Sequence, residues 1–146
     1  MMQQQTQSSN ILAFDQQFAA KEVLSLWMEA LQRRSADALT ELYSDQAVLI
    51  PTLAPDLQRS PHALHQYFTM LTTREELRVV LLQEDFRMLG KNAAIHAGIY
   101  RFEFRDDAGK QCLPARFTFI YGREGAEWKI LHHHSSQLPN AAAAGS

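Results

Sequence analysis

The chain has 146 residues, of which 46% are hydrophobic and 21% are charged, and these values are typical of one globular domain with a substantial core. A formal net charge of −2, with no cluster of Lys and Arg, argues against binding to nucleic acid. The single cysteine, Cys112, excludes an internal disulfide, and no apolar run reaches membrane-spanning length. We therefore expect neither a nucleic-acid partner nor a membrane partner.

Apart from Met1 and Met2, both ends of the chain lack large apolar side chains that a core would bury. Residues 1–10 are rich in glutamine, and residues 140–146 are mostly alanine. We predict that these two segments are disordered tails around one domain at residues 11–139. The first segment has no basic start followed by an apolar stretch, so it does not resemble a secretory signal, and a cytoplasmic location is expected.

Three helices are predicted in the first half of the domain. The first carries apolar residues at the i, i+3, i+4, i+7 spacing of one helix face: Phe14, Phe18, Leu24, Trp27, Met28 and Leu31. Ser35 has the character of an N-cap for a short helix over residues 36–43. After a brief strand at residues 47–50, the pair Ser60–Pro61 marks the start of a third helix.

Four strands are predicted in the second half, at residues 77–89, 93–105, 111–121 and 127–137. Because short turns join them, successive strands must run antiparallel. Helices followed by a meander indicate an α+β fold. A curved sheet wrapped over a helix would form a cone whose open mouth is a natural small-molecule site.

The apolar residues of the central strands alternate in two rows, which one layer of helices cannot cover on both faces. We place one apolar row on the outer face of the sheet: Tyr100, Phe102 and Phe104, or Phe117, Phe119 and Tyr121. An uncovered apolar face favours a second copy related by two-fold symmetry. A homodimer, or a larger ring, is therefore expected.

The last strand ends in three consecutive histidines. Strict alternation puts Trp128, Ile130, His132 and His134 on one side and Lys129, Leu131, His133 and Ser135 on the other. Imidazoles and hydroxyls at the end of an apolar strand need hydrogen-bond partners or a wet cavity. The pattern therefore predicts a pocket or a subunit interface.

Several segments resemble SnoaL-like domains of the nuclear transport factor 2-like superfamily. They are Trp27, residues 38–45 (ALTELYSD), 47–52 (AVLIPT), 97–100 (AGIY), 116–119 (RFTF) and 128–136 (WKILHHHSS). Together they most resemble the association domain of calcium/calmodulin-dependent protein kinase II and its stand-alone bacterial relatives. The resemblance implies a cone-shaped cystatin-like fold, with three N-terminal helices packed on a strongly curved antiparallel sheet. It implies no kinase activity, because neither a kinase catalytic loop nor a glycine-rich phosphate loop is present.

The same resemblance implies an oligomer, assembled through its sheet faces, with an arginine-lined pocket for a small carboxylate or other anion. Arg101 and Arg116 match two of the pocket arginines, and Ser135 stands where a third would be. The predicted ligand-binding residues are Arg101, Arg116, His132, His134, Ser135, Trp27 and Tyr43. The alternative for both arginines is a structural ion pair with Glu103 or another acid.

A small-molecule enzyme is the alternative function. An isomerase, dehydratase, hydrolase or oxidoreductase-labelled relative would use a pocket histidine or carboxylate as its general base. No base with an orienting partner is visible in the sequence, and no catalytic residue is assigned. The His132-x-His134 pair has the spacing of two zinc ligands, but no third ligand accompanies it, so neither a metal nor a cofactor is predicted.

Overall fold

The structure is a computed structural model that describes the backbone of residues 2–140 and the side chains of residues 13–140. Within these residues, three helices and five strands follow one another along the chain. They are α1 (Met2–Gln32), α2 (Ala36–Glu41), β1 (Tyr43–Ile50), α3 (Pro61–Leu71), β2 (Glu75–Met88), β3 (Ala93–Asp106), β4 (Gly109–Glu124) and β5 (Glu127–Gln137). The predicted α+β class is confirmed.

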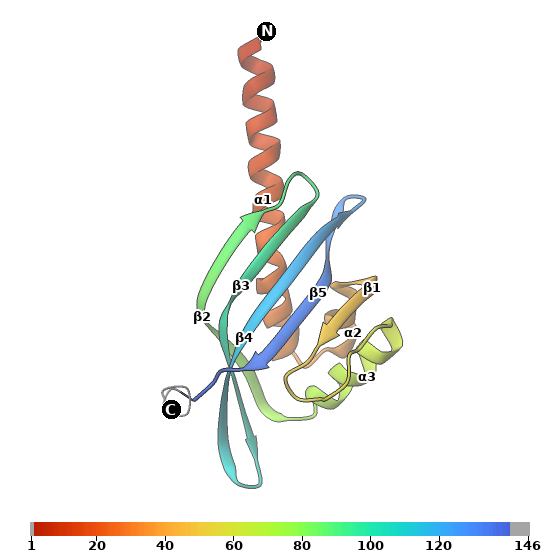
Figure 1. The fold of residues 1–146 in the computed structure, drawn as a ribbon, viewed down its shortest axis with the longest axis vertical. Coiled ribbons are helices and arrows are strands. Elements are labelled where there is room, and N and C mark those ends of the chain that lie inside the picture. The colour runs from red at the N-terminus through yellow and green to blue at the C-terminus, as the bar shows by residue number, and fades with distance from the viewer. Residues whose placement is uncertain (1, 141–146) are drawn as a thin grey trace.

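Helix α1 starts well before the predicted apolar stripe. It runs from Met2 to Gln32, so residues 2–10, which the sequence assigns to a disordered tail, are helical. This segment projects beyond the end of the sheet (Figure 1). It contains no glycine or proline, and a lack of apolar residues argues against burial rather than against helix formation. Residues 141–146 of the predicted C-terminal tail lie outside the described residues.

The five strands form one sheet in the order β1-β5-β4-β3-β2. Strands β2 to β5 pair antiparallel, as the short turns predict, but β1 pairs parallel to β5. The expectation of a wholly antiparallel sheet is therefore wrong. A parallel neighbour needs a long crossover, and here the whole of α3 and β2–β4 separates the two strands in sequence.

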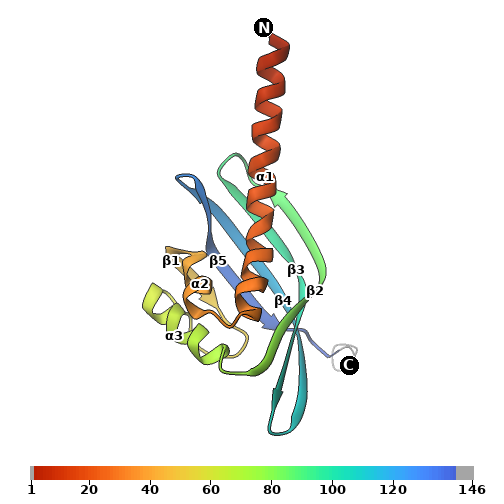
Figure 2. The ribbon, with the colours of Figure 1, turned by 180° about the vertical axis from the view of Figure 1, so that it is seen from behind.

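Helix α1 lies across one face of the sheet, behind the strands in Figure 1 and in front of them in Figure 2. Helices α2 and α3 lie at the β1 end, and no helix covers the opposite face within the described residues. Trp27 of α1 stacks on Tyr100 of β3, with ring centroids 5.5 Å apart, and meets Phe119 of β4 edge-on at 5.7 Å. The strong curvature expected of a cone stays a prediction.

The aromatic rows of β3 and β4 lie on the helix-covered face, so their expected outward position is wrong. Tyr100, Phe102, Phe117, Phe119 and Tyr121 are all buried. The register explains this arrangement, because residues paired across antiparallel strands share a face. The open face instead carries their neighbours in sequence.

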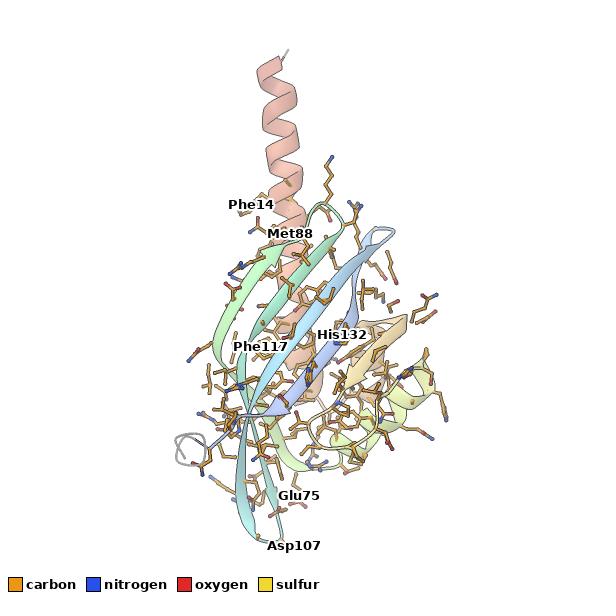
Figure 3. The ribbon with its side chains drawn as sticks, viewed as in Figure 1. Phe14, Glu75, Met88, Asp107, Phe117 and His132 are labelled. Carbon is orange, nitrogen blue, oxygen red and sulfur yellow. The ribbon has the colours of Figure 1, made fainter. Side chains whose placement is uncertain are left out.

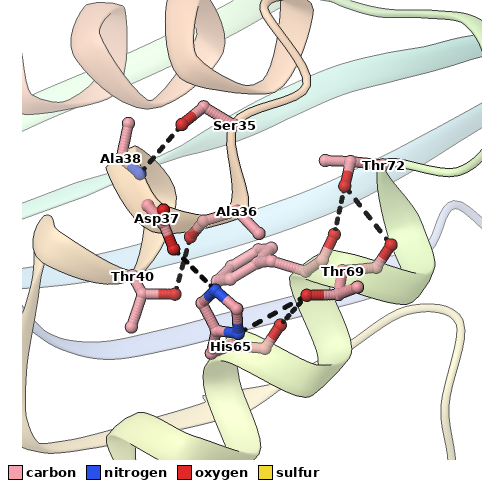
Figure 4. A network of polar contacts seen from close by, with 9 residues as sticks. Ser35, Ala36, Asp37, Ala38, Thr40, His65, Thr69 and Thr72 are labelled. Atoms are coloured by element: carbon pink, nitrogen blue, oxygen red, sulfur yellow. Dashed lines mark hydrogen bonds and ion pairs between the residues drawn. The ribbon is translucent and has the colours of Figure 1, made fainter.

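Helices α2 and α3 are joined by surface contacts (Figure 4). Ser35 caps α2 by accepting a hydrogen bond from the Ala38 amide at 3.1 Å, as predicted. The His65 ring of α3 lies 2.7 Å from an Asp37 carboxylate oxygen of α2. The predicted start of α3 at Ser60–Pro61 is also confirmed, since Ser60 is its N-cap. These contacts fix the helices beside β1.

The pairing register of the sheet shifts at four points, and the β-bulges at two of them bear on the site. In β2 the register shifts between Leu81 and Gln83, and in the β4–β5 pair it shifts between Ile120 and Tyr121. A bulge adds one residue to one strand, so every later side chain on that strand changes face. Both bulges determine which polar residues point toward α1.

Candidate functional site

The sheet separates the predicted site residues into two groups. Trp27, Tyr43 and Ser135 are buried on the helix-covered face. The other four, Arg101, Arg116, His132 and His134, lie on the open face, as their strand pairings place them. The seven residues that the resemblance assigns to one pocket therefore do not line a common pocket, because the arginines do not face the helices. The inner and outer groups must be considered separately.

The bulge in β5 reverses the predicted alternation of the histidines. Tyr121 pairs with Ile130 and Ile120 pairs with His132, so Leu131 is the extra residue. Trp128 and Ile130 still face the core, but after Leu131 the inward residues are His133 and Ser135. Gly122 makes room for this, since a Cβ there would lie 2.5 Å from Leu131 Cδ1.

His133 is the central residue of the inner group and was not among the predicted site residues. Its side chain is 2% exposed, and its ring stacks on Phe119 with centroids 3.9 Å apart. The Trp27 indole N–H donates to the Tyr43 hydroxyl at 3.1 Å, and that hydroxyl lies 2.7 Å from His133 Nδ1. Because an indole nitrogen only donates, the Tyr43 oxygen accepts from it and gives its own proton to Nδ1.

The hydrogen-bond chain continues on the other side of the ring. With Nδ1 accepting, the neutral ring carries its proton on Nε2 and donates it to the Tyr100 hydroxyl at 3.1 Å. Tyr100 donates to Ser135 Oγ at 2.6 Å, and Ser135 lies 2.5 Å from Thr52 Oγ1. Hydrogen bonds thus join side chains from α1, three strands and the segment after β1, and donation runs in one direction from Trp27 to Ser135.

Burial keeps this chain neutral. It lowers the pKa of His133 well below its ordinary value, and the adjacent His132 and His134 lower it further. Burial raises the pKa of the phenols of Tyr43 and Tyr100. Among the described residues, no buried side-chain nitrogen or oxygen lacks a partner. The inner group is therefore a satisfied polar core, and none of its members is poised to exchange a proton with a ligand.

The open face carries half-buried apolar side chains between polar ones. The apolar members are Val48, Ile50, Ile95, Ala97, Ile99 and Ile120. His132 (labelled in Figure 3) pairs with Ile120, and His134 pairs with Thr118. Arg116 pairs with Ile99, near the middle of this face.

The two arginines differ in their partners. Arg101 Nε donates to Glu103 Oε2 at 3.0 Å, and Glu103 is also 3.3 Å from Arg78. The alternative of a structural ion pair for Arg101 is thereby confirmed. Arg116 is exposed, and among the described residues it has neither a hydrogen-bond nor an ion-pair partner. Arg116 therefore differs from Arg101 in presenting a guanidinium without an internal ion-pair partner on this face.

A second buried histidine, His96 of β3, was also missed. Its ring is 1% exposed, with Nδ1 2.9 Å from the Tyr121 hydroxyl and Nε2 2.7 Å from Glu84 Oε2. Burial lowers its pKa, although Glu84 acts in the opposite direction. Gly98, an isolated glycine inside a strand, is the sequence signal that could have pointed to this region.

Neither a metal centre nor a membrane span is found in the described part of the chain. There, no three side chains of the His, Cys, Asp or Glu type gather as metal ligands would. None of the described helices combines the length and apolarity needed to span a bilayer.

Known proteins share this architecture. The family model of the calcium/calmodulin dependent protein kinase II association domain matches residues 17–139. A Xanthomonas campestris structure named for that association domain is 30% identical, with a TM-score of 0.78, over 83% of this chain and 86% of that chain. No curated protein matches.

More distant structures share only the fold. An NTF2-like protein with a cystatin-like fold from Novosphingobium aromaticivorans is 12% identical, with a TM-score of 0.79, over 94% of this chain and 92% of that chain. A Streptomyces avermitilis protein named as a dehydratase of the NTF2-like family is 13% identical, with a TM-score of 0.76, over 86% of this chain and 99% of that chain. The family match and the 30% identical structure confirm the sequence resemblance, and the chain belongs to the calcium/calmodulin-dependent protein kinase II association domain family.

Proposed function

We propose that the chain is a self-associating module in which the open face of the sheet packs against the same face of a second copy. The observation that carries this proposal is the row of half-buried isoleucines that no described helix covers: Ile95, Ile99 and Ile120. Family membership supports the same conclusion, since the matching domain is named for association.

The chemistry of the face suits a two-fold interface. The isoleucines of β3 and β4 lie near the middle of the sheet, while charged residues such as Arg78, Asp85 and Arg87 lie along the β2 edge. An apolar centre with a polar rim is the usual anatomy of a protein interface. In an isologous contact both copies present the same patch to each other. The apolar centre of one copy then meets the apolar centre of the other, and the two polar rims also meet.

Arg116 adds a requirement to this arrangement. A guanidinium beside Ile99 would lose water when the faces meet, and an unpaired buried charge is strongly destabilising. A small carboxylate or another anion bound to Arg116 would remove that cost. We therefore include small-anion binding at Arg116 in the proposed function.

Self-association is tested by measuring the molar mass in solution. Analytical ultracentrifugation of the wild type should give at least a dimer, and Ile120→Asp should shift it to monomer with unchanged circular dichroism. Leu26→Asp, at an exposed apolar residue of α1 on the other side of the sheet, is the matched control and should leave the mass unchanged. A monomeric wild type, or an Ile120→Asp variant of unaltered mass, would overturn the proposal.

Anion binding is tested separately by thermal shift with acetate, malonate and inorganic phosphate. A ligand that binds only the native state raises its apparent stability by mass action. The increase should disappear in Arg116→Gln and persist in Arg105→Gln, whose arginine is already paired with Glu76. Equal shifts in both variants would contradict anion binding at Arg116.

The alternative, a small-molecule enzyme, has lost most of its candidate bases. His132 and His134 face away from the helices, and His133 is enclosed by tyrosines. Glu84 is the remaining carboxylate that combines an orienting histidine with a cavity. The enzyme hypothesis therefore depends on what that cavity binds.

A further inference from the structure

A cavity of about 370 Å³ lies between α1 and the edge of the sheet formed by β2 and β3. This volume is within the range of small-molecule sites. Its walls are largely apolar and come from Phe18, Leu24, Met28 and Leu81, while Glu84 and His96 supply polar atoms. The cavity is on the helix side of the sheet, so it is separate from the open face.

The bulge in β2 directs Glu84 into this cavity. Leu81 pairs with the inward-facing Tyr100, whereas Gln83 pairs with the outward-facing Ile99 and Glu84 with Gly98. Without the extra residue, strict alternation would turn Gln83 inward and Glu84 outward. Bulges of this kind often reorient a side chain beside a functional site.

Gly98 is the residue that permits the bulge. A Cβ at this position would lie 2.0 Å from the backbone oxygen of Gln83, closer than any real contact. The backbone of β2 therefore approaches β3 here in a way that only glycine accepts. The glycine in the sequence and the close backbone approach in the structure thus both indicate that the β2 bulge is a specific feature of this fold.

His96 fixes the Glu84 carboxylate in place. A carboxylate only accepts hydrogen bonds, so His96 Nε2 carries the proton and donates it to Oε2 at 2.7 Å. Its Nδ1 then accepts from the Tyr121 hydroxyl at 2.9 Å. Both ring nitrogens are thus engaged, and the ring acts as a support for Glu84 rather than as a group open to a ligand.

The second oxygen of Glu84, Oε1, has only a long ion pair with Lys21. Lys21 Nζ stands 3.9 Å from Oε1, which is too far for a hydrogen bond, and the Lys21 side chain is half exposed. The Glu84 side chain is itself 34% exposed, and Glu22 brings a further negative charge to the same cavity. An oriented carboxylate above apolar walls, whose own ion pair is long and half exposed, favours a cation with an apolar body that can displace Lys21.

We propose that this cavity binds a small primary amine whose ammonium group pairs with Glu84 and whose aliphatic or aromatic body lies against Leu24, Met28 and Leu81. The ammonium would take the place that Lys21 approaches only loosely. The proposal does not depend on self-association, because the two surfaces lie on opposite sides of the sheet.

The test is an NMR titration of ¹⁵N-labelled protein with phenethylamine, compared with 2-phenylethanol and 3-phenylpropionate. Phenethylamine should shift the amides of Ser25 and Gly98, phenylethanol should bind more weakly, and phenylpropionate should bind least. Glu84→Gln should weaken amine binding about tenfold or more, as expected when a charged hydrogen-bond partner is lost. Asp85→Asn, its neighbour on the opposite face, should leave binding unchanged.

A second variant keeps the proposal testable if Glu84→Gln fails to fold. Met28→Trp fills the cavity without changing its charge and should abolish the shifts, while Ile120→Asp should retain them even as a monomer. Stronger binding of phenylpropionate than of the amine, undiminished amine binding in Glu84→Gln, or shifts confined to other parts of the protein would overturn the proposal.

Discussion

The two buried histidines that we describe, His133 and His96, have similar local structure but different hydrogen-bond partners. Each lies beside a β-bulge that a glycine accommodates: Gly122 accommodates the bulge that turns His133 inward, and Gly98 accommodates the bulge that turns Glu84 toward His96. Each ring also bonds to a tyrosine through Nδ1. The partner of Nε2 differs, being the buried Tyr100 hydroxyl for His133 and the partly exposed Glu84 carboxylate for His96.

This difference shows that a buried histidine beside a β-bulge can have two different roles. Where all partners are neutral and enclosed, the histidine only completes a polar chain in the core, and its loss is a loss of stability. Where one partner is a carboxylate that reaches a cavity, the same arrangement holds a charge in position for something outside the protein. The predictions below test that contrast.

The largest effect is expected from His133→Phe. The new ring fits the space, but the Tyr43 proton and one lone pair of Tyr100 lose their partner in the core, which costs about 2–4 kcal/mol of unfolding free energy. In His96→Phe the carboxylate of Glu84 can still reach water, so the loss should be about half as large. Urea denaturation measures both, with His62→Phe on the exposed face of α3 as control. Equal losses at the two buried sites would contradict the contrast.

The two glycines should differ in the next measurement. Gly98→Ala forces a Cβ against the backbone of Gln83, so the β2 bulge must move, at about 2–3 kcal/mol. Gly122→Ala meets only the end of the Leu131 side chain, which can rotate away, so about 1 kcal/mol is expected. Thermal denaturation ranks the two, and a greater loss for Gly122→Ala would refute this view of the bulges.

Acid should destabilise the protein through both histidines. Their pKa values are lowered in the native state, so below about pH 6.5 the unfolded chain binds protons that the folded chain does not. Their contribution is full above that pH and falls as the pH decreases, by at most about 1.4 kcal/mol per pH unit for each histidine. His133→Phe should reduce the slope between pH 6.5 and 5 more than His96→Phe. A pH-independent unfolding midpoint in that range would show that neither ring stays neutral in the fold.

The smallest effect is expected at an exposed histidine. His65 lies 2.7 Å from Asp37, but both side chains are well exposed to solvent, so water and salt screen the pair. Asp37→Asn should therefore change unfolding free energy by less than about 0.5 kcal/mol. Urea denaturation of Asp37→Asn gives the smallest expected loss of unfolding free energy in this series. A loss as large as that of His96→Phe would show that burial does not determine how much a histidine contributes to stability.

Much of the fold could be predicted from residue periodicity. The helix predicted by apolar spacing, the Ser35 and Ser60 caps and the turns between β2 and β5 depend on local signals, and each is confirmed. Phe14 and Phe18, predicted to extend the apolar stripe of α1, are instead exposed. The pairing of β1 with β5 is not local, and no signal within either strand specifies it. The early start of α1 was missed because the prediction relied on apolar spacing. Polar residues can form a helix without an apolar face, and they then give no such spacing.

The candidate site was harder to predict because one extra residue in a strand determines which side chains face the helices. Alternation put His132 and His134 beside Ile130, and the extra residue Leu131 moved them to the other face. For Arg101, an ion pair with Glu103 was the alternative to the predicted ligand binding, and the structure shows that ion pair. Glu84 and His96 were missed because twelve positions separate them in sequence, and the bulge that joins them is marked only by Gly98.

The parallel pairing of β1 with β5 has a consequence for the order of events during synthesis. Tyr43 and His133, which are 90 positions apart, can bond only after the last strand has emerged from the ribosome. Until then, the hydroxyl of Tyr43 lacks its histidine partner and the core around Trp27 is incomplete. Contacts between residues far apart in sequence slow folding and leave apolar surface exposed to aggregation. A nascent chain that stalls before β5 is therefore a natural client for chaperones.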